Sequence, residues 1–109
     1  MTKSLNKALS MLAIATKAGK VVSGGFMVEK SLQQGMANLV IIACDASNNT
    51  KEKFINKCTY YEVPYRVCTD SKSLGHIIGK QDRMVVAVTD EGLANQVMSK
   101  IDVSLDMEV

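Results

Sequence analysis

The stretch "NLVIIAC", Asn38 to Cys44, decides the fold class of this chain. It is a continuous apolar run rich in β-branched residues, without the alternation of polar and apolar positions. A strand that is covered on both faces of a sheet has this pattern, whereas a strand with one solvated face alternates. The stretch therefore predicts a central strand with helices on both sides, which is a three-layer α/β/α sandwich of the α/β class.

Helical and strand patterns alternate outward from this stretch. Before it we expect a helix ending near Gly19, a short edge strand over 21–23, and a second helix running from a glycine pair at 24–25 to Gly35. After it, helices are expected from a capping box at Asn49, over 71–79, and from Asp90 to Ile101. Strands are expected over 65–69, as a second central strand, and over 84–88. The pattern predicts one domain over residues 1–109 around a mixed sheet of about four strands, with 102–109 as a loose tail.

The composition is that of a soluble globular protein. The chain has 109 residues, of which 47% are hydrophobic and 22% charged. No apolar run approaches the ~20 residues that span a bilayer, and the N-terminus lacks the pattern of a secretory signal. We therefore expect a cytoplasmic protein without a membrane partner.

Three cysteines, Cys44, Cys58 and Cys68, are separated by long gaps, and His76 is the only histidine. The spacing contains no CxxC and places no cysteine near the histidine. Cys44 and Cys68 fall in expected strands and Cys58 on the apolar side of an expected helix, where a free cysteine behaves as a small hydrophobe. We expect three reduced core cysteines, no metal and no cofactor.

The net charge of +2 hides an asymmetry along the chain. Residues 1–83 carry twelve Lys or Arg and six Asp or Glu, whereas residues 84–109 carry one basic and five acidic residues. A basic body suits a polyanionic partner. On charge alone, a solvated surface with chance clustering explains the asymmetry equally well.

No catalytic set stands out, so we expect a non-catalytic protein. The sequence contains no nucleophile elbow, and "SGGFMVEK" has neither the dinucleotide spacing nor the ending of a phosphate-binding P-loop. Asp45 follows the central strand, where open α/β sheets often place functional groups. Alternatively, it bonds backbone amides within its own turn, "DASNNT".

The glycine pair Gly24-Gly25 comes where the second helix must begin. Without a Cβ, these residues let another backbone approach a helix N-terminus, whose free N–H groups favour anions. Phe26 and Lys30 are expected on the same side of that helix. Cations are expected from neighbouring loops at Lys20, Lys80 and Arg83. Such a groove would suit a sugar-phosphate backbone, unless the glycines only relieve crowding in a plain loop.

Four segments together resemble a known family. They are "GMANLVIIACDAS" (35–47), "KCTYYEVPYRV" (57–67), "SLGHIIG" (73–79) and "VVAV" (85–88). In order and spacing they resemble the L-seven-Ae/L-thirty-e family of ribosomal and kink-turn RNA-binding proteins, and most closely its short bacterial YlxQ-like members. The resemblance covers the chain from about Leu9 to Ile101.

The resemblance implies a three-layer fold that binds structured RNA, typically a helix kinked by tandem sheared G·A pairs. It places the RNA at the start of the second helix and at the flanking loops, implies association with ribosomal RNA, and allows ribosomal proteins as further partners. Lys20 is added to this set because its charge is expected on a neighbouring loop. The expected RNA-binding residues are then Lys20, Gly24, Gly25, Phe26, Met27, Lys30, Asp45, Lys80, Arg83 and Met84.

Phe26 and Met27 depart from the family pattern, which commonly has Asn-Glu at these positions. Neither side chain can hydrogen-bond a base edge, so we expect phosphate and shape recognition to remain and base reading to weaken. We expect Phe26 to be buried under the first helix rather than stacked on a base. The alternative function is a protein-interaction adaptor with Phe26 and Met27 in a docking patch; a weaker one is a small nucleotide-binding enzyme.

Overall fold

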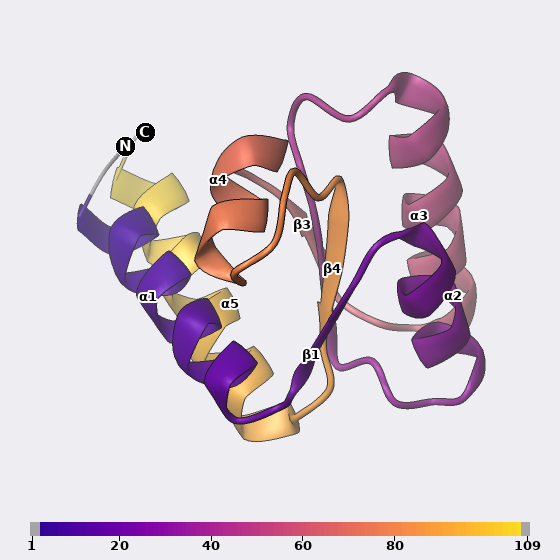
Figure 1. The fold of residues 1–109 in the computed structure, drawn as a ribbon, viewed down its shortest axis with the longest axis horizontal. Helices are drawn as coiled ribbons and strands as arrows, with labels where there is room; N and C mark the ends of the chain where they lie inside the picture. Colours follow the sequence, from indigo (N-terminus) through magenta and orange to yellow (C-terminus); the bar gives the residue numbers. More distant parts are fainter. Residues whose placement is uncertain (1–2, 108–109) are drawn as a thin grey trace.

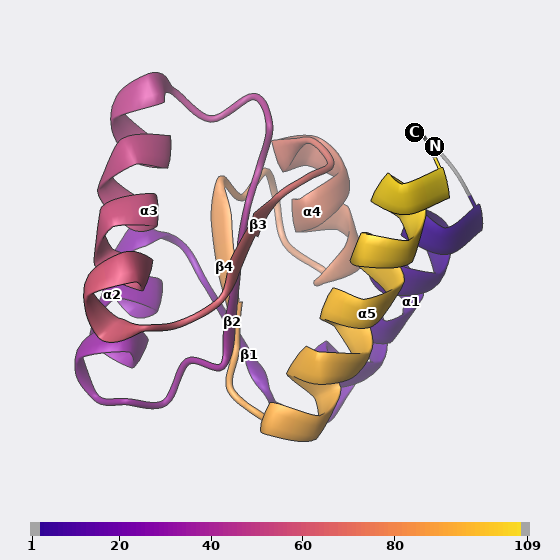
Figure 2. The ribbon, with the colours of Figure 1, turned by 180° about the vertical axis from the view of Figure 1, so that it is seen from behind.

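The computed structural model of the protein describes residues 3–107. Along the chain the elements are α1 (Lys3–Lys17), β1 (Val21–Ser23), α2 (Gly25–Gln33), β2 (Leu39–Ile42), α3 (Asn48–Tyr61), β3 (Tyr65–Val67), α4 (Ser71–Ile77), β4 (Val85–Val88) and α5 (Glu91–Met107). Helices α1, α4 and α5 cover one face of the sheet, and α2 and α3 cover the other (Figures 1 and 2). The predicted three-layer α/β/α sandwich is confirmed.

The sheet has four strands in the order β1-β4-β2-β3. Strand β4 runs antiparallel to both β1 and β2, and β2 runs parallel to β3, so the sheet is mixed. Val40, for example, lies opposite Ala87 of β4 on one side and Tyr65 of β3 on the other. Every residue of β2 and β4 is buried, as expected for the two inner strands.

Strand β3 is an edge strand, and the expectation that it is central was wrong. It is only three residues long, it follows directly on Pro64, and its Val67 is 39% exposed. Proline lacks the N–H that an inner strand must donate, so it is tolerated at the start of an edge strand.

Strand β2 supplies side chains to two separate cores. Leu39 and Ile41 pack into the cluster formed with α1, α4 and α5. Val40 and Ile42 pack into the cluster formed with α2 and α3. Because successive side chains of a strand point to opposite faces, a strand between two helical layers must be apolar at every position. This is why the run at 38–44 lacks alternation.

Helices α2 and α4 each end two residues before the expected position, at Gln33 and Ile77, and larger differences occur at the start of α3 and the end of α5. Ser47, rather than Asn49, caps α3: its hydroxyl accepts a hydrogen bond of 3.1 Å from the Thr50 amide. Helix α5 continues through residues 102–107, which were expected to form a loose tail. Arg66 of β3 holds this part of α5 by a two-pronged ion pair to Asp102, with N···O distances of 2.8 and 3.0 Å. Residues 108–109 of the expected tail lie outside the described part.

The three cysteines are free. Burial raises the pKa of the Cys58 thiol to about 11. The pKa of the Cys68 thiol is also raised to about 11, mainly by burial. Cys44 is exposed just after β2, so the expectation that it is a core residue was wrong. Within residues 3–107, no helix is long and apolar enough to cross a membrane.

Candidate nucleic-acid interface

One edge of the sheet gathers four chain segments that are far apart in sequence. Strands β1, β2 and β3 end there and the antiparallel β4 begins there, which is the upper edge in Figure 1. We call residues 23–27, 43–47, 68–71 and 82–84 the loop edge. Backbone hydrogen bonds hold these segments together: Gly24 N to Val85 O at 3.0 Å, Ala43 N to Met84 O at 2.8 Å, and Cys44 N to Thr69 O at 2.8 Å.

The reason for a glycine at position 24 differs from the reason for one at position 25. Gly24 has φ 86° and ψ 155°, a conformation that essentially only glycine adopts. Gly25 has no such backbone, and a Cβ there would make only an ordinary 3.6 Å contact with the Phe54 ring. Crowding therefore explains neither glycine, contrary to the plain-loop alternative. Nothing within the fold requires position 25 to lack a side chain.

The amino end of α2 offers unoccupied backbone donors. Gly24 stands at the N-cap position of α2 and has no side chain that could accept a hydrogen bond from the first amides of the helix. The first turn of the helix holds no acidic residue. The first N–H groups of an α-helix have no partner within the helix, and here those of Gly25, Phe26 and Met27 face the loop edge. Such N–H groups and the positive end of the helix dipole bind anions such as phosphate.

Phe26 is 77% exposed, so the expectation that it is buried under α1 was wrong. Helix α1 lies on the other side of the sheet from α2 (Figure 1). The buried positions of α2 are Val28, Ser31 and Leu32, and Phe26 lies on the opposite side of the helix. Two further side chains at the loop edge expose apolar surface, Met27 at 44% and Met84 at 42%.

Lys30 lies on the outer face of α2, where it lines a groove with Phe26. It is exposed and forms no ion pair with any described residue. By contrast, Glu29 on the same helix is held by Lys53 at 3.2 Å and Lys57 at 3.1 Å. Lys30 is thus a free cation about one turn into the helix.

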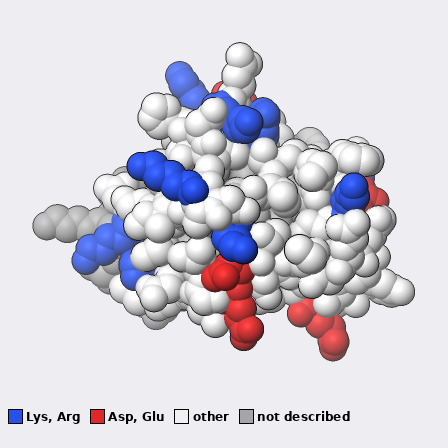
Figure 3. Space-filling view, turned by 60° about the horizontal axis from the view of Figure 1, so that its bottom comes forward, with Lys and Arg blue, Asp and Glu red and all other residues white. Residues whose placement is uncertain are grey.

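Lys20 does not join the loop edge. It precedes β1, and its carbonyl oxygen accepts a 2.8 Å hydrogen bond from Thr89, which follows the far end of β4. Three strand residues, each advancing the chain by about 3.3 Å, separate Lys20 from Gly24. Figure 3 shows mainly the end of the molecule opposite the loop edge, where basic side chains are dispersed among uncharged ones.

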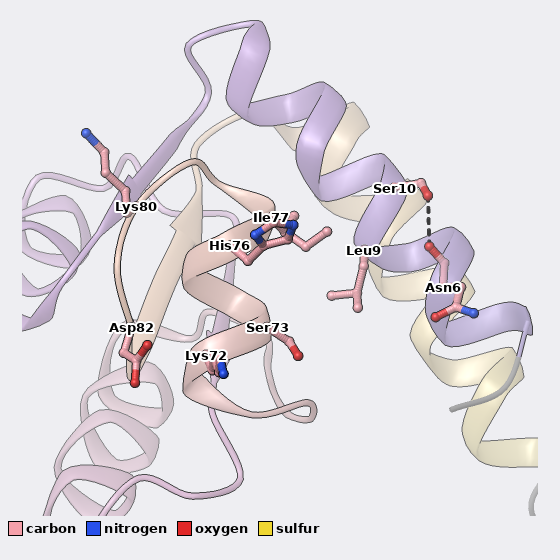
Figure 4. A pocket seen from close by; sticks show the side chains of 9 residues that line it. All are labelled: Asn6, Leu9, Ser10, Lys72, Ser73, His76, Ile77, Lys80 and Asp82. Atoms are coloured by element: carbon pink, nitrogen blue, oxygen red, sulfur yellow. Dashed lines mark hydrogen bonds between the residues drawn. The ribbon is translucent and has the colours of Figure 1, made fainter.

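Lys80 also lies away from the loop edge. Helix α4 carries the chain from Ser71 down the side of the sheet, and Lys80 follows its far end, where its amide bonds Gly75 O at 2.8 Å. There Lys80 lines a hollow of about 680 Å³ between α1 and α4 (Figure 4). The other lining residues are Asn6, Leu9, Ser10, Lys72, Ser73, His76, Ile77 and Asp82.

Arg83 reaches the loop edge but acts there as a clamp. Its Nε donates to the Ser23 hydroxyl at 3.2 Å, and one terminal nitrogen donates to the Asp82 carbonyl at 3.0 Å. Its own amide donates to Ser71 O at 3.0 Å. Arg83 therefore ties the segment before β4 to the end of β1 and to the start of α4. The guanidinium keeps a fixed position beside the amino end of α2.

Asp45 bonds mainly another segment, and the amide of its own turn, which the alternative named, contributes less. Its carboxylate accepts hydrogen bonds of 2.8 Å from both the amide and the hydroxyl of Ser71. These bonds, that of the hydroxyl first, hold the pKa of the Asp45 carboxyl below its usual range, and the charge of Lys51 acts in the same direction. Asp45 thus fixes the loop after β2 to the start of α4.

Lys51 is a cation next to the loop edge that sequence reasoning missed. It lies in the first turn of α3, where its charge reaches Asp45. The available signal was its position four residues after the cap Ser47. In all, the structure brings together seven expected residues at or next to the loop edge, Gly24, Gly25, Phe26, Met27, Asp45, Arg83 and Met84, with Lys30 one turn away. It places Lys20 and Lys80 elsewhere.

Comparison with known proteins decides the family. The model of the ribosomal protein L7Ae/L30e/S12e/Gadd45 family matches residues 6–98. The chain is 47% identical over 92 residues to the RNA-binding protein YlxQ of Bacillus subtilis (strain 168), covering 84% of this chain and 92% of that protein. The chain belongs to the L7Ae/L30e/S12e/Gadd45 family. The resemblance seen in the sequence is thereby confirmed.

Two further comparisons agree with membership of the L7Ae/L30e/S12e/Gadd45 family. The RNA-binding protein YlxQ of Enterococcus faecium is 33% identical over 96 residues, covering 88% of this chain and 92% of that protein. A solved structure of a protein of unknown function from Bacillus halodurans has a TM-score of 0.85 at 38% identity. That match covers 88% of this chain and 97% of the other.

Proposed function

We propose that this protein is a non-catalytic RNA-binding protein that recognises structured RNA of the kink-turn type at its loop edge. Relatives that match most of the chain are RNA-binding proteins by name. The observation that carries the proposal is the amino end of α2, where uncapped amides lie beside a glycine that the fold itself does not require. The absence of a side chain at position 25 leaves room for a phosphate to approach these amides closely.

The proposed contacts divide into two kinds. The amides of residues 25–27 and the ammonium group of Lys30 would bind phosphates, and Arg83 presents a fixed guanidinium beside them. Phe26 and Met27 offer no hydrogen bonds to base edges. Recognition would therefore depend on the bent shape of the RNA backbone more than on the identity of its paired bases.

The RNA partner is proposed to be ribosomal RNA or another structured RNA with a bent internal loop. The family name supports the ribosomal choice. Co-sedimentation of the protein with ribosomal subunits after mild lysis would place it on the ribosome. Ribosomal proteins next to that RNA would then be its protein neighbours.

A titration against two RNAs tests this function. One is a standard kink-turn, and the other is the same RNA without its G·A pairs, which no longer holds the bend. We expect tighter binding to the kink-turn. We also expect affinity to fall steeply with salt, because each cation–phosphate contact releases counterions. Equal affinity for both RNAs and for heparin would reduce the protein to a general polyanion binder and overturn the proposal.

The second candidate function is a protein-interaction adaptor. The observation that favours it is the exposed apolar surface of Phe26, Met27 and Met84 at one edge. A pull-down with and without nuclease separates the two functions. Partners that are lost with the RNA support RNA binding, and partners that persist through the apolar patch support the adaptor.

A further inference from the structure

We propose that the free edge of β1, together with a hollow beside it, binds an extended acidic peptide segment of a protein partner as an added strand. One side chain of that segment, with an apolar body and a polar tip as in tyrosine, enters the hollow. The inference goes beyond the proposed RNA binding, because it uses the side of β1 and not the amides at the start of α2.

Strand β1 forms one edge of the sheet, where it pairs with β4 alone among the described strands. Figure 1 shows it in front of the other strands, with α1 on one side and α2 on the other. Both ends of β1 bond β4: Thr89 N donates to Lys20 O at 2.8 Å, and Gly24 N donates to Val85 O at 3.0 Å. Such bonds alternate along an antiparallel strand, so residue 22 also bonds β4.

This alternation leaves the backbone N–H and C=O groups of Val21 and Ser23 facing outward. No backbone bond from a turn, loop or cap of the described residues reaches these groups. They present two donors and two acceptors at the spacing of a strand, and an extended peptide offers the matching groups. Phosphates offer acceptors alone and would leave the two carbonyl groups unpaired. The edge therefore suits a peptide backbone better than a nucleic-acid backbone.

A hollow of about 320 Å³ lies beside β1 on the α2 side of the sheet. We call it the β1 hollow; its lining includes Val22, Met27, Ser31 and Met36. On α2, Glu29 faces the lysines of α3, with which it forms two ion pairs. Met27 and Ser31 lie on the other side of that helix, away from α3, so the β1 hollow opens toward the free edge.

The β1 hollow is placed to receive one side chain of an added strand. Side chains of directly opposite residues in paired strands point to the same face of the sheet. Val22 points to the α2 side, where it packs against the core, so a peptide residue opposite Val22 points into the β1 hollow. Two walls are apolar and adaptable, because Met27 is 44% and Met36 53% exposed.

Ser31 supplies an unpaired polar group to the β1 hollow. It is only 5% exposed, and its hydroxyl has no hydrogen-bond partner among the described residues. Thr16 in α1, by contrast, bonds the carbonyl oxygen of Leu12 at 2.9 Å. A buried hydroxyl is destabilising until it gains a partner. The apolar walls and this hydroxyl together favour a side chain such as tyrosine, which has an apolar ring and a polar tip.

The charge beside the edge favours an acidic peptide. Lys30 lines the β1 hollow and Lys20 directly precedes β1; both are exposed, and neither forms an ion pair with a described residue. None of the described residues that line the β1 hollow is acidic. Carboxylates flanking the inserted side chain would complement these cations. A second copy of this chain would instead add its own lysines to the same edge.

The test begins with a phage library of short random peptides, selected on the full chain. We expect the enriched sequences to combine acidic residues with one tyrosine-like side chain. The strongest peptide, labelled with fluorescein, is then titrated against protein variants by fluorescence anisotropy. Ser31→Ala removes the unpaired hydroxyl, so it should keep the stability of the wild type. It should weaken peptide binding by roughly 2- to 12-fold, the effect of one hydrogen bond.

Val21→Pro blocks the edge itself. Proline has no N–H, its ring stands where the added strand would lie, and it is tolerated at the start of an edge strand. We expect peptide affinity to fall by at least about 10-fold. Val21→Ala is the matched control, because it shortens the same side chain and keeps the N–H. Ser10→Ala is the control for Ser31→Ala, since the Ser10 hydroxyl bonds Asn6 O in α1, on the other face of the sheet.

Thermal unfolding of each variant checks the fold, and Ser31→Ala decides alone if Val21→Pro does not fold. Peptides that bind both variants as tightly as the wild type would overturn the inference, as would a selection without enriched sequences. A kink-turn affinity that falls in both variants would assign the edge to RNA instead. A wild-type dimer that Val21→Pro converts to a monomer would assign it to a second copy. Kink-turn binding by the wild type tests the proposed RNA function separately.

Discussion

Gly75→Ala is expected to destabilise the protein by about 3 kcal/mol or more, because overpacking against rigid backbone has few ways to relax. A Cβ at position 75 of α4 would overlap the backbone carbonyl group of Gln81 and lie 3.0 Å from the Cα of Asp82. The Gln81 carbonyl group and the Asp82 Cα belong to the backbone of the segment that leads into β4, so neither can rotate away as a side chain would. The segment must move, and with it the Arg83 clamp on the loop edge.

Thermal unfolding measures this effect, with Gly92→Ala as the control. Gly92 lies in α5, where a Cβ would meet only the Asp90 side chain, at 3.5 Å. That substitution should be neutral or stabilising by up to about 1 kcal/mol, as alanine is the better helix former. For Gly75→Ala we expect a midpoint lower by about 12 °C or more. Midpoints that agree within a few degrees would show that residues 81–82 do not press on α4.

Gly25→Ala is expected to fold normally and to lose RNA affinity by about 10- to 100-fold. The Cβ has room beside Phe54, and alanine suits a helix better than glycine, so the stability should be unchanged or slightly higher. The methyl group would stand between the α2 amides and an approaching phosphate. Losing one charge-assisted hydrogen bond of about 1.5–3 kcal/mol accounts for the expected loss.

Gly24→Ala is the companion that separates the two roles of the glycine pair. An alanine at φ 86° and ψ 155° is strained by about 1–3 kcal/mol, so this variant should lose stability. Unfolding and RNA affinity measured on both variants should thus show a stability loss at position 24 and an affinity loss, without destabilisation, at position 25. Wild-type affinity in a folded Gly25→Ala variant would show that the RNA does not pass close to α2.

The layered fold was predictable because its signals are local. An apolar strand without alternation at 38–44 requires cover on both faces, and glycines at 19 and 35 take the positive φ that ends a helix. The order of the strands was harder. Strand β3 lies at an edge because β4 pairs between β1 and β2. No local sequence pattern predicts which strands become neighbours.

The candidate site was predictable where it depends on the start of one helix, and not where it depends on distant contacts. Phe26 was misplaced although helical spacing already puts it opposite Val28 and Leu32, on the outer face of α2. Lys20 and Lys80 are near the site in sequence, but a strand and a helix carry them away from it. The contact between Arg83 and Ser23 joins residues sixty positions apart and leaves no local trace in the sequence.

The position of the RNA on the protein is the central claim, and amide chemical-shift mapping tests it most directly. A ¹⁵N-labelled sample titrated with a kink-turn RNA should show its largest shifts at residues 24–27, 30, 44–45 and 83–84. Residues at the opposite end of the sheet, such as Tyr60, Glu62 and Glu91, should keep their shifts. Shifts concentrated at that opposite end, or in the hollow between α1 and α4, would contradict the account.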